Sequence, residues 1–324
     1  MADGGRPRGG IAAMPEAKVE CAGDGTMNDR NATMTARSPV GIRPSGGLLG
    51  AEVTGIDASA DLSSAMPALL EAFARHHLVV LRDQQLTDQQ IYEFAQRFGP
   101  VEKHKNRDAT GTVFGDVHSI TNLGANGMPS LRPGVNENYY WHSDKAHEAV
   151  PCLLTMLYAV EIPPTGGDTE FADMESAYDA LDPEMKARIE NLCVEHSWGY
   201  MRETITGRAP TDEERVKSPP VVHPLVRVHP DTGRKSLYLG MYCRRIINSP
   251  DEDEGRSLLK QLTEHATQPR FIFTHKWQPH DLIFWDNRCL MHRAIANFDL
   301  SAHRRVLRRA VVRGKPEWVG RRSQ

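Results

Sequence analysis

The spacing of apolar and polar residues predicts a chain that mixes helices with short strands. Apolar pieces separated by glycines between residues 41 and 53 are typical of strands and their turns. Residues 66–77 repeat apolar side chains at helical spacing, and the apolar residues 78–81 that follow predict a buried strand. A Thr-x-x-Gln sequence at residues 87–90 fits a capping box, which starts a second helix that we expect to run to Phe98.

The later part of the chain predicts a strand-rich core with a few covering helices. An apolar run at residues 152–160, broken chiefly by Thr155, is typical of a buried strand. Residues 174–193 predict a helix with a break at Asp182-Pro183. Paired strands are expected at residues 221–239, around a turn at Asp231-Thr232-Gly233. Further strands are expected at residues 169–171, 271–273, 281–285 and 306–312, and a last helix at residues 252–266. This pattern favours a mixed α+β fold built on a β-sandwich or jelly roll.

Composition divides the chain into a leader and one globular domain. Residues 1–38 lack periodicity and predict a disordered leader, and residues 39–324 are expected to form a single domain. The formal net charge of −3 offers no basic field for nucleic acid, and no segment approaches the roughly 18 consecutive apolar residues that a membrane span needs. Scattered cysteines without a C-x-x-C pair suit a reducing cytosol, so we expect a cytoplasmic protein.

The stretch Trp141-His142-Ser143-Asp144 carries the candidate chemistry. On an extended strand, His142 and Asp144 point to the same side, because strand side chains alternate. A second imidazole, from His292, would complete a set of two histidines and one carboxylate. Such a set leaves positions open on Fe(II) for a cosubstrate and for O2.

A second His-x-Asp sequence, His229-Pro230-Asp231, competes with the first. About one such triplet is expected by chance in a chain with 14 histidines. Because Pro230-Asp231-Thr232-Gly233 is a turn signal, we expect Asp231 to shape the turn rather than bind metal. The alternative for the first triplet is a histidine packed beside Trp141 and a carboxylate that caps a loop. We expect His76-His77 to end a helix and Cys289 to serve packing.

Hydroxyl and basic side chains further along the chain favour the metal interpretation. The glycines of Gly166-Gly167-Asp168-Thr169 let the backbone approach a ligand, and the Thr169 hydroxyl can donate to an anion. Alternation along a strand places Arg305, Leu307 and Arg309 on one face, and inward-pointing arginines are costly unless they meet carboxylates. Two anions are therefore expected near the metal.

Motifs in unbroken order over roughly residues 40–316 carry a family resemblance. They are Trp-His-Ser-Asp, Pro-Pro-Thr-Gly-Gly-Asp-Thr-Glu-Phe-Ala-Asp-Met, His-Pro-Leu-Val-Arg-x-His-Pro-x-Thr-Gly-Arg-Lys, Trp-Asp-Asn-Arg-Cys-x-x-His-Arg and the closing arginine strand. The chain resembles the taurine / 2,4-dichlorophenoxyacetate dioxygenase family of Fe(II)- and 2-oxoglutarate-dependent oxygenases. The resemblance implies a double-stranded β-helix core.

The resemblance also implies roles for individual residues. It implies that His142, Asp144 and His292 are the iron ligands. It implies that Thr169 and Arg305 hold the far carboxylate of 2-oxoglutarate, with Arg304 as the weaker candidate, and that Arg309 lies near the other carboxylate or an anionic substrate group. Two further positions, His104 and Asn138, match residues that contact taurine in the family.

Together these features predict an Fe(II)- and 2-oxoglutarate-dependent dioxygenase that uses O2 to hydroxylate a small organic anion. The anion would resemble a phenoxyacetate, a sulfonate or a sulfate ester, and hydroxylation next to the heteroatom would cleave it. Because 2-oxoglutarate would match Arg305, we expect Arg309 to lack a protein partner and to meet the substrate, together with His104, under the loop from Val101 to Asn138. The alternatives are the same chemistry on an amino acid or biosynthetic intermediate, and a metal-binding jelly roll without turnover. A homo-oligomer is expected.

Overall fold

The computed structural model describes residues 40–103, 116–124, 126–130 and 137–315. Contacts divide the chain into residues 1–37 and residues 38–324, and every described residue belongs to the second unit. The predicted leader at residues 1–38 lies outside the described residues, as does His104.

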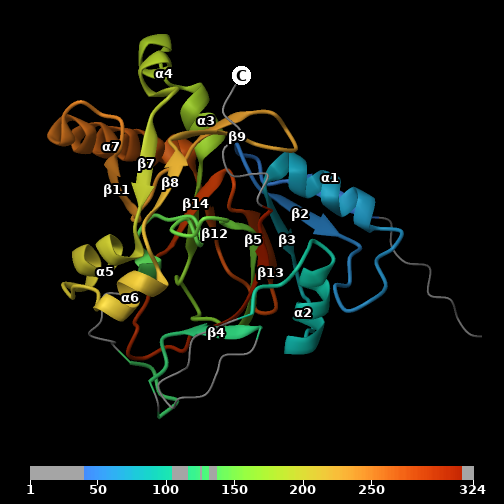
Figure 1. Ribbon diagram of the computed structural model, residues 1–324. Helices are drawn as coiled ribbons and strands as arrows, with labels where there is room; N and C mark the ends of the chain where they lie inside the picture. Colours follow the sequence, from blue (N-terminus) through green and yellow to red (C-terminus); the bar gives the residue numbers. More distant parts are fainter. Residues whose placement is uncertain (1–39, 104–115, 125, 131–136, 316–324) are drawn as a thin grey trace, which may run out of the picture. The chain divides into compact units, whose positions relative to one another are not determined.

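Among the described residues, the larger sheet of the core has seven strands, several of which are labelled in Figure 1. Its neighbouring strands are antiparallel except for one parallel pair, β2 with β3. The strands lie in the order β1 (Gly41–Pro44), β2 (Ala51–Thr54), β3 (Leu78–Leu81), β13 (Leu282–Asp286), β5 (Cys152–Glu161), β15 (Val306–Arg313) and β4 (His118–Thr121). Segments that are far apart in the sequence thus become neighbours in the sheet. One of them is β15, the expected arginine strand, which lies beside β5.

A second, three-stranded sheet packs against the first through a shared cluster of buried side chains. It consists of β12 (Ile272–His275), β6 (Thr169–Asp173) and β14 (Leu290–Ala294). Strand alternation sends Trp285 and Leu307 of the large sheet into the same cluster as Phe171 and Leu290 of the small one. Two facing sheets of this kind confirm the predicted jelly-roll core within a mixed α and β fold.

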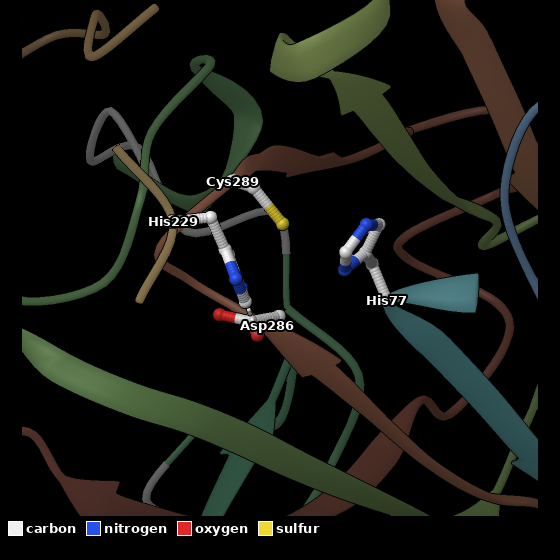
Figure 2. A group of neighbouring side chains, drawn as sticks. All are labelled: His77, His229, Asp286 and Cys289. Carbon is white, nitrogen blue, oxygen red and sulfur yellow. Dashed lines mark hydrogen bonds and ion pairs between the residues drawn. The ribbon is translucent and has the colours of Figure 1, made fainter. Parts of the chain in front are cut away.

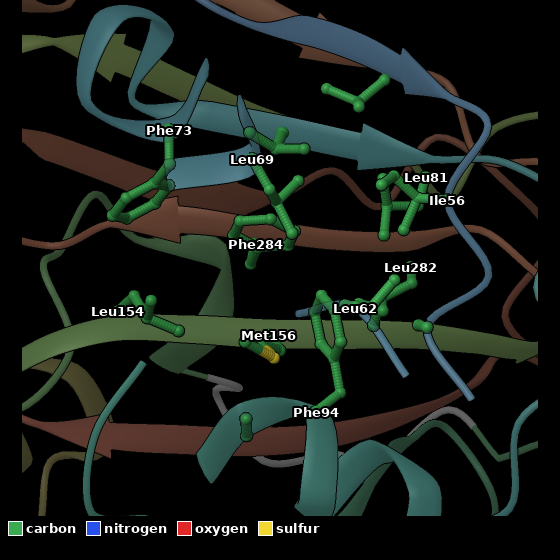
Figure 3. Close-up of a cluster of buried hydrophobic side chains, with 14 of the residues drawn as sticks. Ile56, Leu62, Leu69, Phe73, Leu81, Phe94, Leu154, Met156, Leu282 and Phe284 are labelled. Atoms are coloured by element: carbon green, nitrogen blue, oxygen red, sulfur yellow. The ribbon is translucent and has the colours of Figure 1, made fainter. Parts of the chain in front are cut away.

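Helices α1 (Met66–His76) and α2 (Asp88–Gln96) cover the outer face of the large sheet (Figures 1 and 3). The rings of Phe73 from α1 and Phe94 from α2 both pack against Phe284 of β13. Phe284 is fully buried, so its truncation to alanine should cost about 3–5 kcal/mol. The predicted capping box is present at Thr87, and α1 ends as expected at His77, which has a positive φ of 57°.

A helical and stranded region lies between β6 and β12 and packs on the small sheet through its own buried cluster. It comprises α3 (Met174–Asp179), α4 (Pro183–Ile189), β7 (Cys193–His196), α5 (Trp198–Thr206), α6 (Asp212–Lys217), β8 (Val221–Pro224), β9 (Val226–Val228), β10 (Lys235–Leu237), β11 (Cys243–Ile246), α7 (Glu252–Ala266) and the 3-10 turn η2 (Pro269–Phe271). A further 3-10 turn, η1 (Glu137–Tyr139), precedes β5.

One helix prediction in this region is wrong at its C-terminal end. The predicted break at Asp182-Pro183 is present, because the Asp182 carboxylate accepts the backbone N–H of Met185 and starts α4 as a separate helix, but α4 ends at Ile189. The predicted helix therefore extends too far, since Cys193 already belongs to strand β7, which pairs with β8 and β11. The predicted hairpin is confirmed by the antiparallel pair β9 and β10. Among the described residues, no helix combines the length and apolarity needed to cross a membrane.

Candidate metal centre

His142, Asp144 and His292 converge in one cavity, which is lined by residues of both sheets. Each offers a ligand atom, and these atoms all lie within 4.8 Å of one another. The Nε2 atoms of His142 and His292 are each 3.7 Å from a carboxylate oxygen of Asp144, too far for a hydrogen bond. Atoms that share a transition-metal ion at about 2.1 Å lie roughly 3–3.6 Å apart, so this spacing fits a metal within a few tenths of an ångström.

The backbone that presents these side chains differs from the extended strand expected for residues 142–144. His142 forms an isolated β-bridge with His292 through two backbone hydrogen bonds of 2.8 and 3.1 Å, and the chain then turns at Asp144. The pairing brings two segments 150 residues apart into register. The Nδ1 atom of His142 lies 2.7 Å from the backbone carbonyl of Tyr140, which can only accept, so Nδ1 donates this bond and Nε2 is the nitrogen that faces Asp144.

Asp144 is a buried carboxylate that its surroundings keep ionised. Burial acts to raise its pKa, but Arg309 first, and then His292 and His142, hold the pKa well below its usual range. Thr155 also donates a hydrogen bond to Oδ2 at 2.6 Å. The pKa of His292 lies well below its usual value, chiefly because burial disfavours the charged ring, so this imidazole is available as a neutral ligand.

Arg305 and Thr169 form an anion site in the same cavity. The guanidinium donates to the carbonyl of Gly167 at 2.9 Å and to Thr169 Oγ1 at 3.4 Å, and among the described residues no carboxylate pairs with it. Burial lowers the pKa of Arg305 to about 10. Thr169 Oγ1 also accepts the indole N–H of Trp277 at 3.1 Å, so its own proton is free to donate. A buried cation without a counter-charge is costly, and this pair therefore fits one carboxylate of a bound ligand.

The expectation that Arg309 lacks a partner in the protein is wrong. Its Nη2 lies 2.5 Å from Asp144 Oδ1, and burial opposes but does not prevent a raised pKa for this guanidinium. The predicted alternation is present, because Arg305, Leu307 and Arg309 all line the cavity. Arg304 faces away and pairs with Glu161 on the surface.

Asn138 in η1 lines the cavity as well, next to the apolar side chains Ile120 and Leu157. Of the predicted substrate contacts, Asn138 and Arg309 are thus brought to the triad of His142, Asp144 and His292, and His104 lies outside the described residues. The cavity joins the triad, the Arg305 anion site and an apolar wall, which is a suitable arrangement for oxidising a C–H bond next to a bound keto acid.

A second buried cluster contains His77, His229, Asp286 and Cys289 (Figure 2). Nε2 of His229 lies 3.0 Å from Asp286, and its Nδ1 accepts two backbone N–H groups of the turn at Asp231. Both nitrogens of His229 are therefore used within the protein. Asp231 lies in this turn, and its carboxylate pairs with Arg288 at 2.7 Å.

Charges in the second cluster are neutralised by the protein itself. Arg288 donates to both oxygens of Asp286, and although burial acts to raise the pKa of Asp286, this arginine holds it well below its usual range. His77 pairs with the buried carboxylate of Glu175 at 3.2 Å. Burial raises the pKa of Cys289 far above its usual value, and the side chain belongs to the core between the sheets, as expected for a packing residue.

Two residues that bond to the triad were not assigned a role from the sequence. Thr155 of β5 and Asn287, in the turn between β13 and β14, link to each other and to Asp144. A signal for each was present: Thr155 is the polar residue in an otherwise apolar strand, and Asn287 lies inside the Trp-Asp-Asn-Arg motif.

Comparisons with known proteins agree with this geometry. Residues 41–311 match the model of the Taurine catabolism dioxygenase TauD, TfdA family. The chain is 38% identical, over 72% of its length and 84% of the relative's, to the alpha-ketoglutarate-dependent 2,4-dichlorophenoxyacetate dioxygenase of Cupriavidus pinatubonensis. It is 36% identical, over 85% and 95% of the two chains, to the (S)-phenoxypropionate/alpha-ketoglutarate-dioxygenase of Sphingobium herbicidovorans.

A solved structure shares the fold. The crystal structure of AAD-2 in complex with Mn(II) and N-oxalylglycine superposes with a TM-score of 0.77 at 38% sequence identity. The match covers 89% of this chain and 100% of that one.

Proposed function

The chain belongs to the taurine catabolism dioxygenase TauD, TfdA family and is a 2-oxoglutarate-dependent dioxygenase, and we propose that it uses Fe(II) and O2 to hydroxylate a small organic anion. The observation that carries this proposal is the buried Arg305 without a carboxylate partner among the described residues, in one cavity with His142, Asp144 and His292. A protein that only stored metal would have no use for this anion site.

In this proposal the triad holds the metal and the Arg305 site holds the cosubstrate. Two neutral imidazoles and one carboxylate suit Fe(II) and leave positions open on it. Thr169 and Arg305 would bind the far carboxylate of 2-oxoglutarate and so fix its orientation. When bound, Fe(II) and 2-oxoglutarate supply the oxidising chemistry, with succinate and CO2 as products. Ile120, Leu157 and Leu307 line the cavity, and their apolar side chains would limit the access of water to it.

The proposed substrate is an anion of the phenoxyacetate, sulfonate or sulfate-ester kind. The relatives named for 2,4-dichlorophenoxyacetate and (S)-phenoxypropionate act on aryloxy acids, which supports this class. Arg309 uses one N–H on Asp144, and its fork has further donors for a substrate anion or for the metal-bound end of the cosubstrate. Hydroxylation of a carbon attached to oxygen or sulfur gives an unstable product, so the net reaction would be cleavage.

Anaerobic titration tests the metal and cosubstrate assignment. Addition of 2-oxoglutarate to the Fe(II) protein should produce a weak visible metal-to-ligand absorption, and its absence in a protein that still binds Fe(II) would contradict the proposal. Succinate release should then be measured across aryloxy acids, sulfonates, sulfate esters and amino acids, and stimulation by amino acids alone would contradict the anion class.

The role of Arg309 can be separated from that of the cosubstrate site. If Arg309→Gln retains the slow, substrate-free decarboxylation of 2-oxoglutarate but loses stimulation by anions, Arg309 binds substrate. If both activities fall together, Arg309 serves the cosubstrate or Asp144.

We also propose that the protein works in the cytoplasm as a homo-oligomer. The scattered cysteines support the compartment, and light scattering of the purified protein would test the assembly. A monomer at micromolar concentration would exclude the oligomer.

A further inference from the structure

The side chains of Thr155 and Asn287 close a ring of hydrogen bonds with Asp144, the carboxylate of the triad. The backbone N–H of Asp144 donates to Asn287 Oδ1 at 3.1 Å. Asn287 Nδ2 donates to Thr155 Oγ1 at 3.1 Å, and Thr155 Oγ1 donates to Asp144 Oδ2 at 2.6 Å. Thr155 and Asn287 are both buried, at 0% and 1% exposure, so water does not compete for these bonds.

The direction of every bond in the ring is determined by its neighbours. The indole N–H of Trp285 can only donate, and it lies 3.2 Å from Asn287 Oδ1, which fixes the orientation of the amide. The amide nitrogen of Asn287 therefore faces Thr155 and donates to it. A threonine hydroxyl has one proton, and because its oxygen accepts from Asn287, that proton is directed to Asp144. Asp144 is thus held at its backbone and at its carboxylate by the same two residues.

We infer that Thr155 and Asn287 are positioning residues that hold Asp144 in the orientation required to bind the metal. The inference rests on the proposed metal role of the triad and deepens it. Neither residue reaches the metal or the substrate, since both act through Asp144. Without the ring, the carboxylate would keep its ion pair with Arg309, which lies on Oδ1, and could rotate toward that arginine. To bind the carboxylate, the metal would then have to break a stronger ion pair between Asp144 and Arg309.

The decisive measurement is metal affinity in the absence of turnover. Thr155→Val removes the hydroxyl and keeps the shape of the side chain. We expect it to weaken Co(II) binding, followed by visible absorption without 2-oxoglutarate, by about 10- to 100-fold, the usual cost of losing a partner of a metal ligand. Thr155→Ser restores the hydroxyl and should restore most of the affinity. Asn287→Ala, which acts one bond further from the carboxylate, should weaken Co(II) binding less than Thr155→Val.

A purely structural role would give a different result. The control is Ser236→Ala, which removes another fully buried hydroxyl, one that donates to the carbonyl of Arg288. It should lower the melting temperature of the apoprotein without changing the Co(II) affinity. Wild-type Co(II) affinity in Thr155→Val, or in Asn287→Ala if the valine variant does not fold, would overturn the inference. His142→Ala distinguishes a failure of the proposed metal centre from a failure of the positioning role of Thr155 and Asn287. If His142→Ala also binds Co(II) normally, the assignment of the metal centre is wrong and the inference falls with it.

Discussion

The triad and the second cluster each contain two histidines and one aspartate, with Cys289 in addition in the second; all of these residues are buried, and in each group the ligand atoms lie within 4.8 Å of one another. They differ in what those atoms face. In the triad, the Nε2 atoms of His142 and His292 stand 3.7 Å from the carboxylate, beyond hydrogen-bond distance, so the three groups do not bond to one another. In the second cluster, the corresponding distances are 3.0 Å for His229 with Asp286 and 3.2 Å for His77 with Glu175, so the groups bond to one another.

Charge separates the two clusters in the same way. Asp286 is held by a guanidinium at both oxygens and by an imidazole, whereas each oxygen of Asp144 has one short partner, Arg309 or Thr155. A divalent cation at the second cluster would have to displace Arg288 from a buried pair. Proximity of histidine and carboxylate is therefore a poor guide to metal binding unless the ligand atoms retain free lone pairs. The second cluster instead holds the turn between β13 and β14, which carries Asn287 and leads to His292.

The largest expected effect comes from removing a metal ligand. His142→Ala should abolish succinate formation and Co(II) binding while the protein stays folded, because a ligand is lost and no ion pair that supports the fold is broken. Circular dichroism and metal titration measure the two properties separately. Undiminished succinate formation would remove His142 from the metal centre.

The reverse result is expected in the second cluster. Asp286→Asn breaks a buried ion pair with Arg288 and should destabilise the fold by about 3–5 kcal/mol in urea unfolding. At temperatures where the variant is folded, Co(II) should still bind. The matched control is Asp231→Asn, since this half-exposed carboxylate pairs with the same arginine and should cost less than about 1 kcal/mol. Loss of metal binding with wild-type stability would contradict the structural assignment of this cluster.

Arg305 and Arg304 are adjacent in sequence and differ in environment, so they test the anion site. Arg305→Ala should cost about 2–5 kcal/mol of cosubstrate binding, which raises the required 2-oxoglutarate concentration by roughly 30-fold or more. Arg304→Ala should leave this requirement unchanged, because Arg304 pairs with Glu161 on the surface. If only Arg304→Ala raised the requirement, the assigned register of the arginine strand would be off by one residue.

A smaller effect on the stability of the fold is expected when the pH is lowered. It comes from two histidines that belong neither to the triad nor to the second cluster. Burial, with Lys145 nearby, lowers the pKa of His147 to about 4, and burial with Arg227 lowers that of His223 to about 4, against an ordinary value of 6.5. Between pH 6.5 and pH 4 the unfolded chain binds more protons than the folded one, so stability falls as the pH is lowered. Because one pKa unit is worth about 1.4 kcal/mol, a loss of roughly 1–3 kcal/mol is expected between pH 7 and pH 5.

Urea unfolding at several pH values measures this loss. His147→Gln, which does not titrate, should flatten the pH dependence in that window. An equally steep dependence in both His147→Gln and His223→Gln would assign the acid sensitivity to other groups.

Features that depend on a few consecutive residues could be predicted from the sequence. The capping box at Thr87 and the hairpin turn after His229 need only their own side chains and backbone, and both are present. The inward face of Arg305, Leu307 and Arg309 follows from strand alternation alone. The candidate triad could be chosen for its residue types and motif order, which reflect the chemistry of the ligands rather than their positions.

Tertiary structure decided which of these groups face each other. Whether Arg309 is paired depends on where Asp144 lies, and the sequence separates the two residues by 165 positions, so its partner appeared only when β15 lay beside β5. His229 directly precedes a turn signal in the sequence, and only the structure shows that its ring bonds to Asp286 of β13. The ring of Thr155, Asn287 and Asp144 joins three segments for the same reason. Hydrogen bonds and ion pairs act over about 3–4 Å in space, and only the packing of the two sheets brings residues far apart in the chain within that range.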